Sequence, residues 1–127
     1  GGVQMPSAFQ AAFITVPDRR TALALSRGLV RGSLAACVNI LPGVRSIYRW
    51  KGKVEEAREL LLVAKTRSNR CKELIAFVRE KHPYSLPETV FFPLSGGNAE
   101  YLEWIEENTT ASKEGLRHGP RLRRGRG

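Results

Sequence analysis

Short apolar runs of strand length alternate along this chain with segments whose apolar residues recur every three to four positions. The first run, residues 8–16, predicts a β-strand that Pro17 ends. Residues 19–31 then follow helical spacing, with Asp18 as N-terminal cap and Gly32 placed for a left-handed C-terminal cap. The chain therefore opens with a strand and a helix.

A long hairpin is predicted next. Its first arm begins with the apolar run 34–41, is interrupted by Pro42-Gly43, and continues over 44–50, where alternate side chains are apolar or aromatic. The residues 51–53 form a tight polar turn, and the returning arm covers 54–66. The returning arm begins charged and ends apolar, so we expect the inner half of the hairpin to be buried and the outer half solvated.

The second half of the chain repeats the alternation. Ser68 is placed to cap a helix that Pro83 ends, and residues 89–94 form a strand in which Pro93 indicates a sheet edge. Asn98 precedes a last helix. The order β-α-β-β-α-β-α predicts an α+β fold, the ferredoxin-like βαββαβ sandwich with an extra C-terminal helix, in which the first and third strands are central.

The predicted strands are apolar on both faces. Phe13 and Ile14 are neighbours in the first strand, for example, although neighbouring strand residues point to opposite sides. Strands of this kind are normally buried on both faces. A monomer with one sheet and one layer of helices has nothing to cover the second face of the sheet. We therefore expect a homo-oligomer, with Tyr48 and Trp50 of the hairpin, and Trp104 of the last helix, at the subunit interface.

Charge at first suggests a nucleic-acid partner, since the 127 residues carry a net charge of +9. More than half of that excess lies in residues 111–127, where six basic residues face one acidic residue in a Gly/Arg/Pro context typical of disorder. We divide the chain into a flexible start (1–7), one folded domain (8–110) and this basic tail. The third strand has no aromatic residue of the kind that stacks RNA bases, so no specific nucleic-acid binding is expected.

Candidate chemistry is sparse. No apolar stretch approaches the length of a membrane span. The two cysteines, Cys37 and Cys71, form no CxxC pair, which favours a reducing, cytoplasmic location. An organellar or secretory form is the alternative if the chain derives from a longer precursor. Cys37 and His82 could together bind copper(I) or zinc. From spacing alone, a small buried cysteine and a helix-terminal histidine are the simpler interpretation, because no metal-ligand motif fits. Nothing indicates an activated nucleophile or a tuned base, so no enzyme is predicted.

Several spaced motifs resemble those of the CutA family, the divalent-cation tolerance proteins. They are AACVN (35–39), IYRWKGK (47–53), KT (65–66), HPYSLPE (82–88) and GNAEYLEW (97–104). The resemblance implies a homotrimer in which hairpins extend the neighbouring subunit's sheet. It also implies a role in tolerance of, and response to, copper and other divalent metals.

The resemblance also implies which residues would carry these roles. Cys37 matches the family's strand-two cysteine, and His82 and Glu88 match its histidine-to-glutamate block, which makes these three the expected ligands of copper or another divalent cation. No cofactor is expected to be required for folding. The alternative is a trimeric scaffold or signalling protein that binds a small ligand or a client protein, as animal members linked to acetylcholinesterase anchoring or processing suggest.

Overall fold

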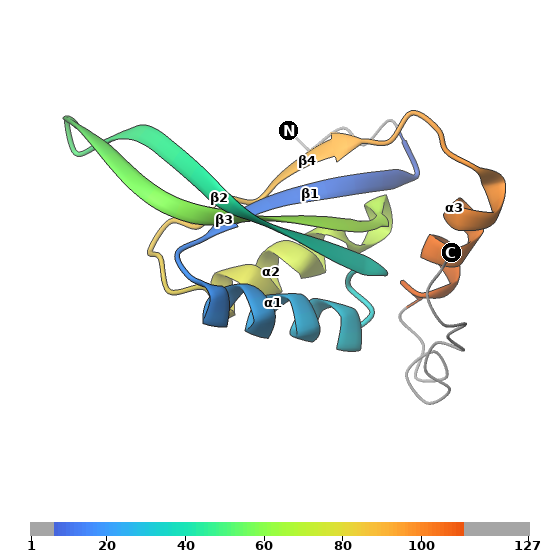
Figure 1. Ribbon diagram of the computed structural model, residues 1–127. Coiled ribbons are helices and arrows are strands. Elements are labelled where there is room, and N and C mark those ends of the chain that lie inside the picture. Colours follow the sequence, from blue (N-terminus) through green and yellow to red (C-terminus); the bar gives the residue numbers. More distant parts are fainter. Residues whose placement is uncertain (1–6, 111–127) are drawn as a thin grey trace.

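The computed structural model describes residues 7–110 and places four strands and three helices in them (Figure 1). The elements are, in order, β1 (Phe9–Val16), α1 (Arg19–Arg31), β2 (Cys37–Trp50), β3 (Lys53–Arg67), the 3₁₀ turn η1 (Ser68–Arg70), α2 (Cys71–Lys81), β4 (Val90–Pro93) and α3 (Ala99–Glu107). The predicted basic tail lies outside the described residues. So does the predicted flexible start, except for Ser7, whose hydroxyl donates to the Leu94 carbonyl at 2.8 Å.

The strands form one antiparallel sheet in the order β2-β3-β1-β4. Helices α1 and α2 lie together on one face of it, and α3 lies beyond one end of the strands (Figure 1). This arrangement confirms the ferredoxin-like prediction, including the central positions of β1 and β3. Strand β4, which ends in Pro93, is an edge strand as expected.

The core lies between the sheet and the two helices. Alternate residues of the central strands, such as Ile14 and Leu62, are fully buried there against Leu25 of α1 and Leu74 of α2. Burial of such side chains supplies most of the free energy that offsets the ordering of the chain. No helix in residues 7–110 is long and apolar enough to span a membrane.

The end of α1 differs from the prediction. Gly32 has a φ of −85°, and the left-handed residue is instead Ser33, with a φ of 58°. The Leu34 N–H donates to the Leu29 carbonyl at 2.9 Å, and the Ser33 N–H donates to the Val30 carbonyl at 3.0 Å. These two bonds form a Schellman motif, which places the left-handed conformation one residue later than glycine preference alone suggested.

Two further boundaries also differ. Ser68 does not cap α2, because its hydroxyl bonds the Ser7 carbonyl and accepts from the Gln10 side-chain amide, so it ties the start of β1 to η1. In β2 the strand begins at Cys37 and runs unbroken through Pro42-Gly43, which form a β-bulge opposite Leu60. The Pro42-Gly43 pair, which predicts an interruption of the strand, forms a bulge in which Gly43 has a φ of +80°.

The sheet face opposite α1 and α2, here called the open face, is apolar. It carries Phe13, Leu61, Val63 and Phe92, none of which is buried within one chain. Phe13 and Phe92 pack against each other with ring centroids 4.5 Å apart. The expectation of apolar residues on both faces of the sheet is therefore confirmed.

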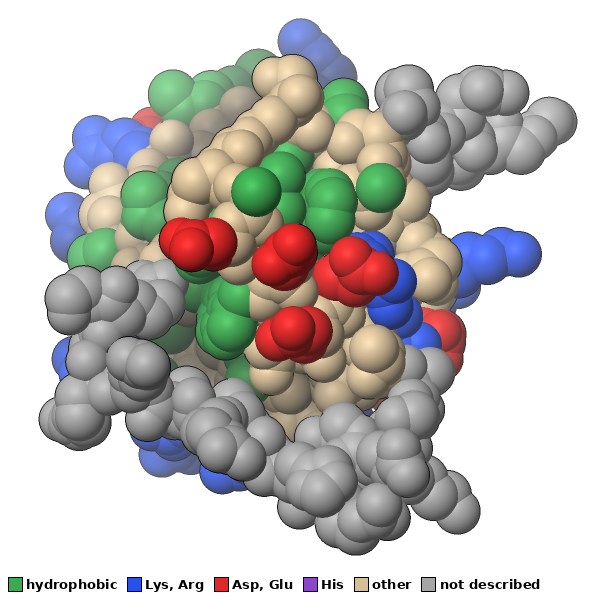
Figure 2. Space-filling view, turned by 90° about the vertical axis from the view of Figure 1, so that its right-hand side faces the viewer, with side chains coloured by type: hydrophobic (Ala, Val, Ile, Leu, Met, Phe, Trp, Pro, Cys, Tyr) green, Lys and Arg blue, Asp and Glu red, His purple; other side chains and the backbone are tan. Residues whose placement is uncertain are grey.

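At one end of the molecule, α3 approaches β3. The Lys65 ammonium lies 5.7 Å from the centre of the Tyr101 ring, and Ile105 is fully buried. Arg67 holds the end of α3 through the Thr109 hydroxyl at 3.0 Å. Figure 2 views this end of the molecule and shows acidic side chains gathered beside hydrophobic ones. Helix α3 carries four glutamates and no basic residue, so this helix is acidic in a chain whose net charge is positive.

Candidate functional site

The residues implied by the sequence converge in part on a pocket that extends from the base of the hairpin toward its tip, here called the hairpin-base pocket. It is a recess of about 600 Å³ on the open-face side. It is lined by Thr15, Ser46, Ile47, Tyr48, Arg49, Trp50, Glu59, Tyr84, Ser85, Leu86 and Glu88. It therefore combines aromatic walls with two carboxylates, contributed by β3 and by the loop between α2 and β4.

His82 lies beside this pocket, but its side chain has a structural role. Pro83 ends α2 and forces His82 into an extended conformation, which turns its buried ring toward β1. The His82 Nδ1 accepts the Tyr84 N–H at 3.1 Å, so Nε2 carries the proton and donates to the Thr15 carbonyl at 2.7 Å. Both ring nitrogens are thus occupied within the chain. A metal ion could bind His82 only after one of these hydrogen bonds broke.

Tyr84 connects His82 to a buried carboxylate. Its ring packs against the imidazole with centroids 4.7 Å apart, and its hydroxyl donates to Glu59 Oε2 at 2.8 Å. Burial, and then the neighbouring Glu59 carboxylate, raise the pKa of the Tyr84 hydroxyl well above its ordinary range. Tyr84 therefore stays protonated and acts as a fixed hydrogen-bond donor to Glu59.

Glu88 reaches the same pocket from the loop before β4. It is exposed, and its Oε1 accepts the Thr15 hydroxyl at 3.3 Å. Thr15 therefore contacts both His82, through its carbonyl, and Glu88, through its side chain. Glu59 and Glu88 line the same pocket, and carboxylate oxygens are the ligand type that hard divalent cations prefer, but Glu59 already accepts the Tyr84 hydroxyl.

Cys37 lies elsewhere. It begins β2 on the open face, opposite Lys65, which in turn is opposite Ala11 of β1. His82 contacts β1 at Thr15, four residues further on and roughly 13 Å along the strand. In residues 7–110, no three side chains of His, Cys, Asp or Glu group closely enough to hold a metal ion. Cys37, His82 and Glu88 therefore do not fit as one metal site within a single chain.

The predicted interface residues are divided between two places. Tyr48 and Trp50 lie near the hairpin tip with 45% and 41% of their surface exposed, and both line the hairpin-base pocket. Trp104 lies on α3, half-buried, with its ring 5.4 Å from that of Tyr101. Exposed aromatic side chains at a protruding hairpin are the kind of residue that protein interfaces favour.

Sequence reasoning missed Thr15, Glu59 and Tyr84 as members of this pocket. The charged start of the returning arm predicts a solvated outer half of the hairpin, yet Glu59 of that arm is buried. Its position directly before the apolar run 60–64 was the available signal, since alternation there places Glu59 on the side of Leu61. Tyr84 could be located only once the chain reversal at Pro83 was known.

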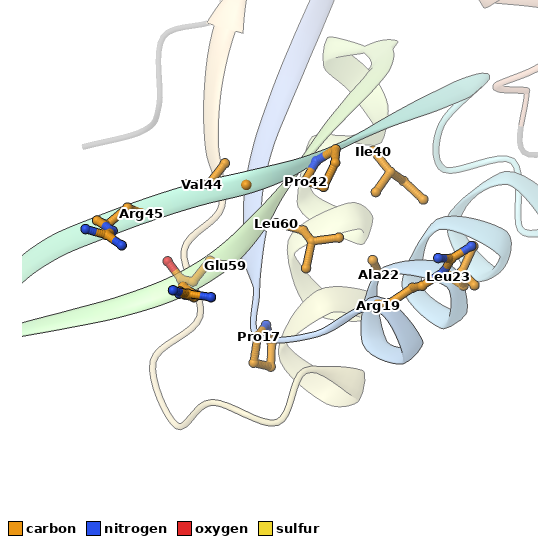
Figure 3. Close-up of a pocket in the computed structure, with 12 residues that line it drawn as sticks. Pro17, Arg19, Ala22, Leu23, Ile40, Pro42, Val44, Arg45, Glu59 and Leu60 are labelled. Carbon is orange, nitrogen blue, oxygen red and sulfur yellow. The ribbon is translucent and has the colours of Figure 1, made fainter.

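A second recess lies on the other face of the hairpin base, and Figure 3 shows it closely. We call it the arginine pocket. It is a recess of about 760 Å³ lined by Pro17, Arg19, Ala22, Leu23, Ile40, Pro42, Gly43, Val44, Arg45, Arg58, Glu59 and Leu60. It lies between the first turn of α1 and the bulge of β2, and no residue predicted to be functional lines it.

Comparison with known proteins agrees with this architecture. The family described as CutA1 divalent ion tolerance protein matches residues 10–108, which cover every helix and nearly all of every strand described above. The chain belongs to this family. The identification confirms the resemblance that the spaced motifs indicated. The family's description associates it with divalent-ion tolerance.

Named relatives support the assignment. The divalent-cation tolerance protein CutA of Thermus thermophilus is 48% identical over 100 residues, which cover 79% of this chain and 97% of that protein. Human protein CutA is 40% identical over 116 residues, or 91% of this chain. The chain spans 65% of the human protein's length.

Solved structures of CutA1 proteins share the fold. The structure from Thermus thermophilus has a TM-score of 0.79 at 47% identity and covers 80% of this chain and 99% of its own. The structure from Oryza sativa has a TM-score of 0.80 at 38% identity and covers 86% and 100%. These matches take in the larger part of the described chain, including the sheet from which the long hairpin extends.

Proposed function

We propose that this CutA1-family chain is a non-enzymatic homotrimer that binds copper or another divalent cation and acts in metal tolerance. The family assignment supports the metal role, and the open face carries the proposal of an assembly. That face presents Phe13, Leu61, Val63 and Phe92, with Phe92 49% exposed, and no helix of the described chain covers it. An exposed apolar surface of this kind is typical of a subunit interface.

Cys37 is the strongest candidate ligand for a soft metal. Its side chain is partly exposed on the open face, and its sulfur lies 3.9 Å from Asn39 Oδ1. Cys71, by contrast, is buried, and burial raises the pKa of its thiol to about 11, which disfavours the thiolate that binds metals. If copies of the chain assemble through the open face, Cys37 lies on the surface that they share.

Native mass spectrometry under reducing conditions, with copper(I) added, tests the assembly and the metal together. We expect a particle of three chains that retains copper, and a Cys37→Ser variant of the same assembly that loses it. Cys71→Ala serves as the matched control and should keep copper. A lone 14.2 kDa particle would contradict the trimer. Equal copper binding by wild type and a Cys37→Ser, His82→Ala double variant would contradict the assigned ligands.

A further inference from the structure

The arginine pocket has a floor and a rim of different chemistry. Leu23 of α1, Ile40 of β2 and Leu60 of β3 form an apolar floor, with Pro17 and Pro42 at its ends. The bulge at Pro42-Gly43 shapes the wall on the β2 side (Figure 3). The recess therefore offers apolar contact area at the point where the hairpin leaves the body of the molecule.

The rim concentrates positive charge. Arg45 and Arg58 are directly opposite each other in the β2–β3 ladder, an arrangement that like charges disfavour. Arg19 lies at the first position of α1, directly after the N-cap Asp18, whose carboxylate accepts the Thr21 N–H at 2.8 Å. Three guanidinium groups thus border one recess.

These charges are only partly compensated. Arg45 contacts Glu56 at 3.3 Å, but both side chains are more than half exposed, so the pair is weak. Within residues 7–110, no carboxylate lies within 4.0 Å of a nitrogen of Arg19 or Arg58. Glu59 also lines the recess, but its carboxylate accepts the Tyr84 hydroxyl at 2.8 Å, and the Asp18 carboxylate accepts the Thr21 N–H. The pocket therefore keeps an excess of positive charge above an apolar floor.

We propose that the arginine pocket binds a small organic anion. Its phosphate or carboxylate group pairs with Arg58 and Arg45, and its apolar body lies on Leu23, Ile40 and Leu60. A planar guanidinium group matches either head group with two parallel hydrogen bonds. Binding of such an anion would also remove the repulsion between the two opposed arginines. This site is separate from Cys37, so its occupation does not depend on the metal role proposed above.

Isothermal titration of the full chain tests this site with probes of defined chemistry. Phenyl phosphate and phenylacetate separate the two head groups, inorganic phosphate lacks the apolar body, and benzyl alcohol lacks the charge. We expect at least one aromatic anion to bind more tightly than inorganic phosphate and benzyl alcohol. Arg58→Gln should weaken that binding about tenfold, the effect of losing one charge-assisted pair.

Arg27→Gln is the matched control, because it removes the same charge from an exposed position of α1 outside the pocket. It should change the affinity less than about twofold, because a distant exposed charge is screened. Arg58→Gln should also raise the melting temperature of the free protein, since it relieves the repulsion from Arg45, whereas a structural role for Arg58 predicts a decrease. Absence of binding by both aromatic anions, equal weakening by the two variants, or a lower melting temperature for Arg58→Gln would overturn the proposal.

Discussion

At the scale of single residues, Gly28 shows how packing can select a residue that helix propensity disfavours. A Cβ atom at this position would lie 2.5 Å from Cζ of Phe77 in α2. We expect Gly28→Ala to destabilise the fold by about 1–3 kcal/mol, because the overpacking exceeds the roughly 1 kcal/mol that alanine gains in a helix. Urea unfolding at fixed protein concentration measures it.

The control for that change is Gly96→Ala, where the added methyl group meets nothing within 4 Å. It should alter the free energy of unfolding by less than about 0.5 kcal/mol. A Gly28→Ala variant as stable as wild type would show that the Phe77 ring can move aside, and that the close approach of α1 and α2 does not require glycine.

Cys71 predicts a dependence of stability on pH. Burial raises the pKa of its thiol from 9.0 to about 11, so the folded state keeps a proton that the unfolded chain releases first. Its contribution to stability is therefore full below pH 9 and is lost as the pH rises toward 11. Between these values the free energy of unfolding of Cys71→Ala should decline less steeply than that of wild type. Parallel declines would contradict this assignment.

At the scale of elements, the hairpin turn can be improved. Lys51 and Gly52 have φ values of 50° and 82°, the two positive angles of a type I′ turn. Asparagine adopts the first of these more readily than lysine. Lys51→Asn should therefore stabilise the protein by about 0.5 kcal/mol in urea unfolding. Lys53→Asn, at the first position of β3, should give no gain. Equal effects of the two changes would contradict the conformational explanation.

The elements were largely predictable because their signals are local. Apolar periodicity and stops such as Pro17 and Pro83 were enough to place strands and helices in the correct order. The errors lie where two neighbouring residues could each adopt a given backbone conformation. At the end of α1, Ser33 has the left-handed conformation that was expected of Gly32. The position of the left-handed residue depends on which carbonyls at the end of α1 accept the following N–H groups. The pattern of apolar and polar residues does not contain this information.

The candidate site was less predictable than the fold. Cys37 and His82 stood out in the sequence as candidate ligands, but their separation follows from strand register and from the two hydrogen bonds of the His82 ring. Glu59 became a pocket residue only through Tyr84, which a chain reversal brings back from 25 positions away. Sites built from distant segments need the register of the sheet before they can be identified.

At the scale of the whole molecule, charge and apolar surface separate into different regions. The hairpin base carries the opposed arginines on the helix side, while the open face is apolar on the other side of the same sheet. Assembly through the open face would therefore leave the arginine pocket on a different side of each subunit. Long-range repulsion between basic subunits would have to be offset by the apolar area that they bury.

The open face therefore gives the most direct test of assembly. Phe92 is 49% exposed on edge strand β4, so Phe92→Glu should fold while placing a charge on the proposed interface. We expect light scattering to show single chains in place of the proposed trimer, because burying an unpaired carboxylate costs several kcal/mol. Val30→Glu places the same charge on α1, at a residue 39% exposed, and should leave the assembly intact. If Phe92→Glu assembles like wild type, the subunits meet elsewhere.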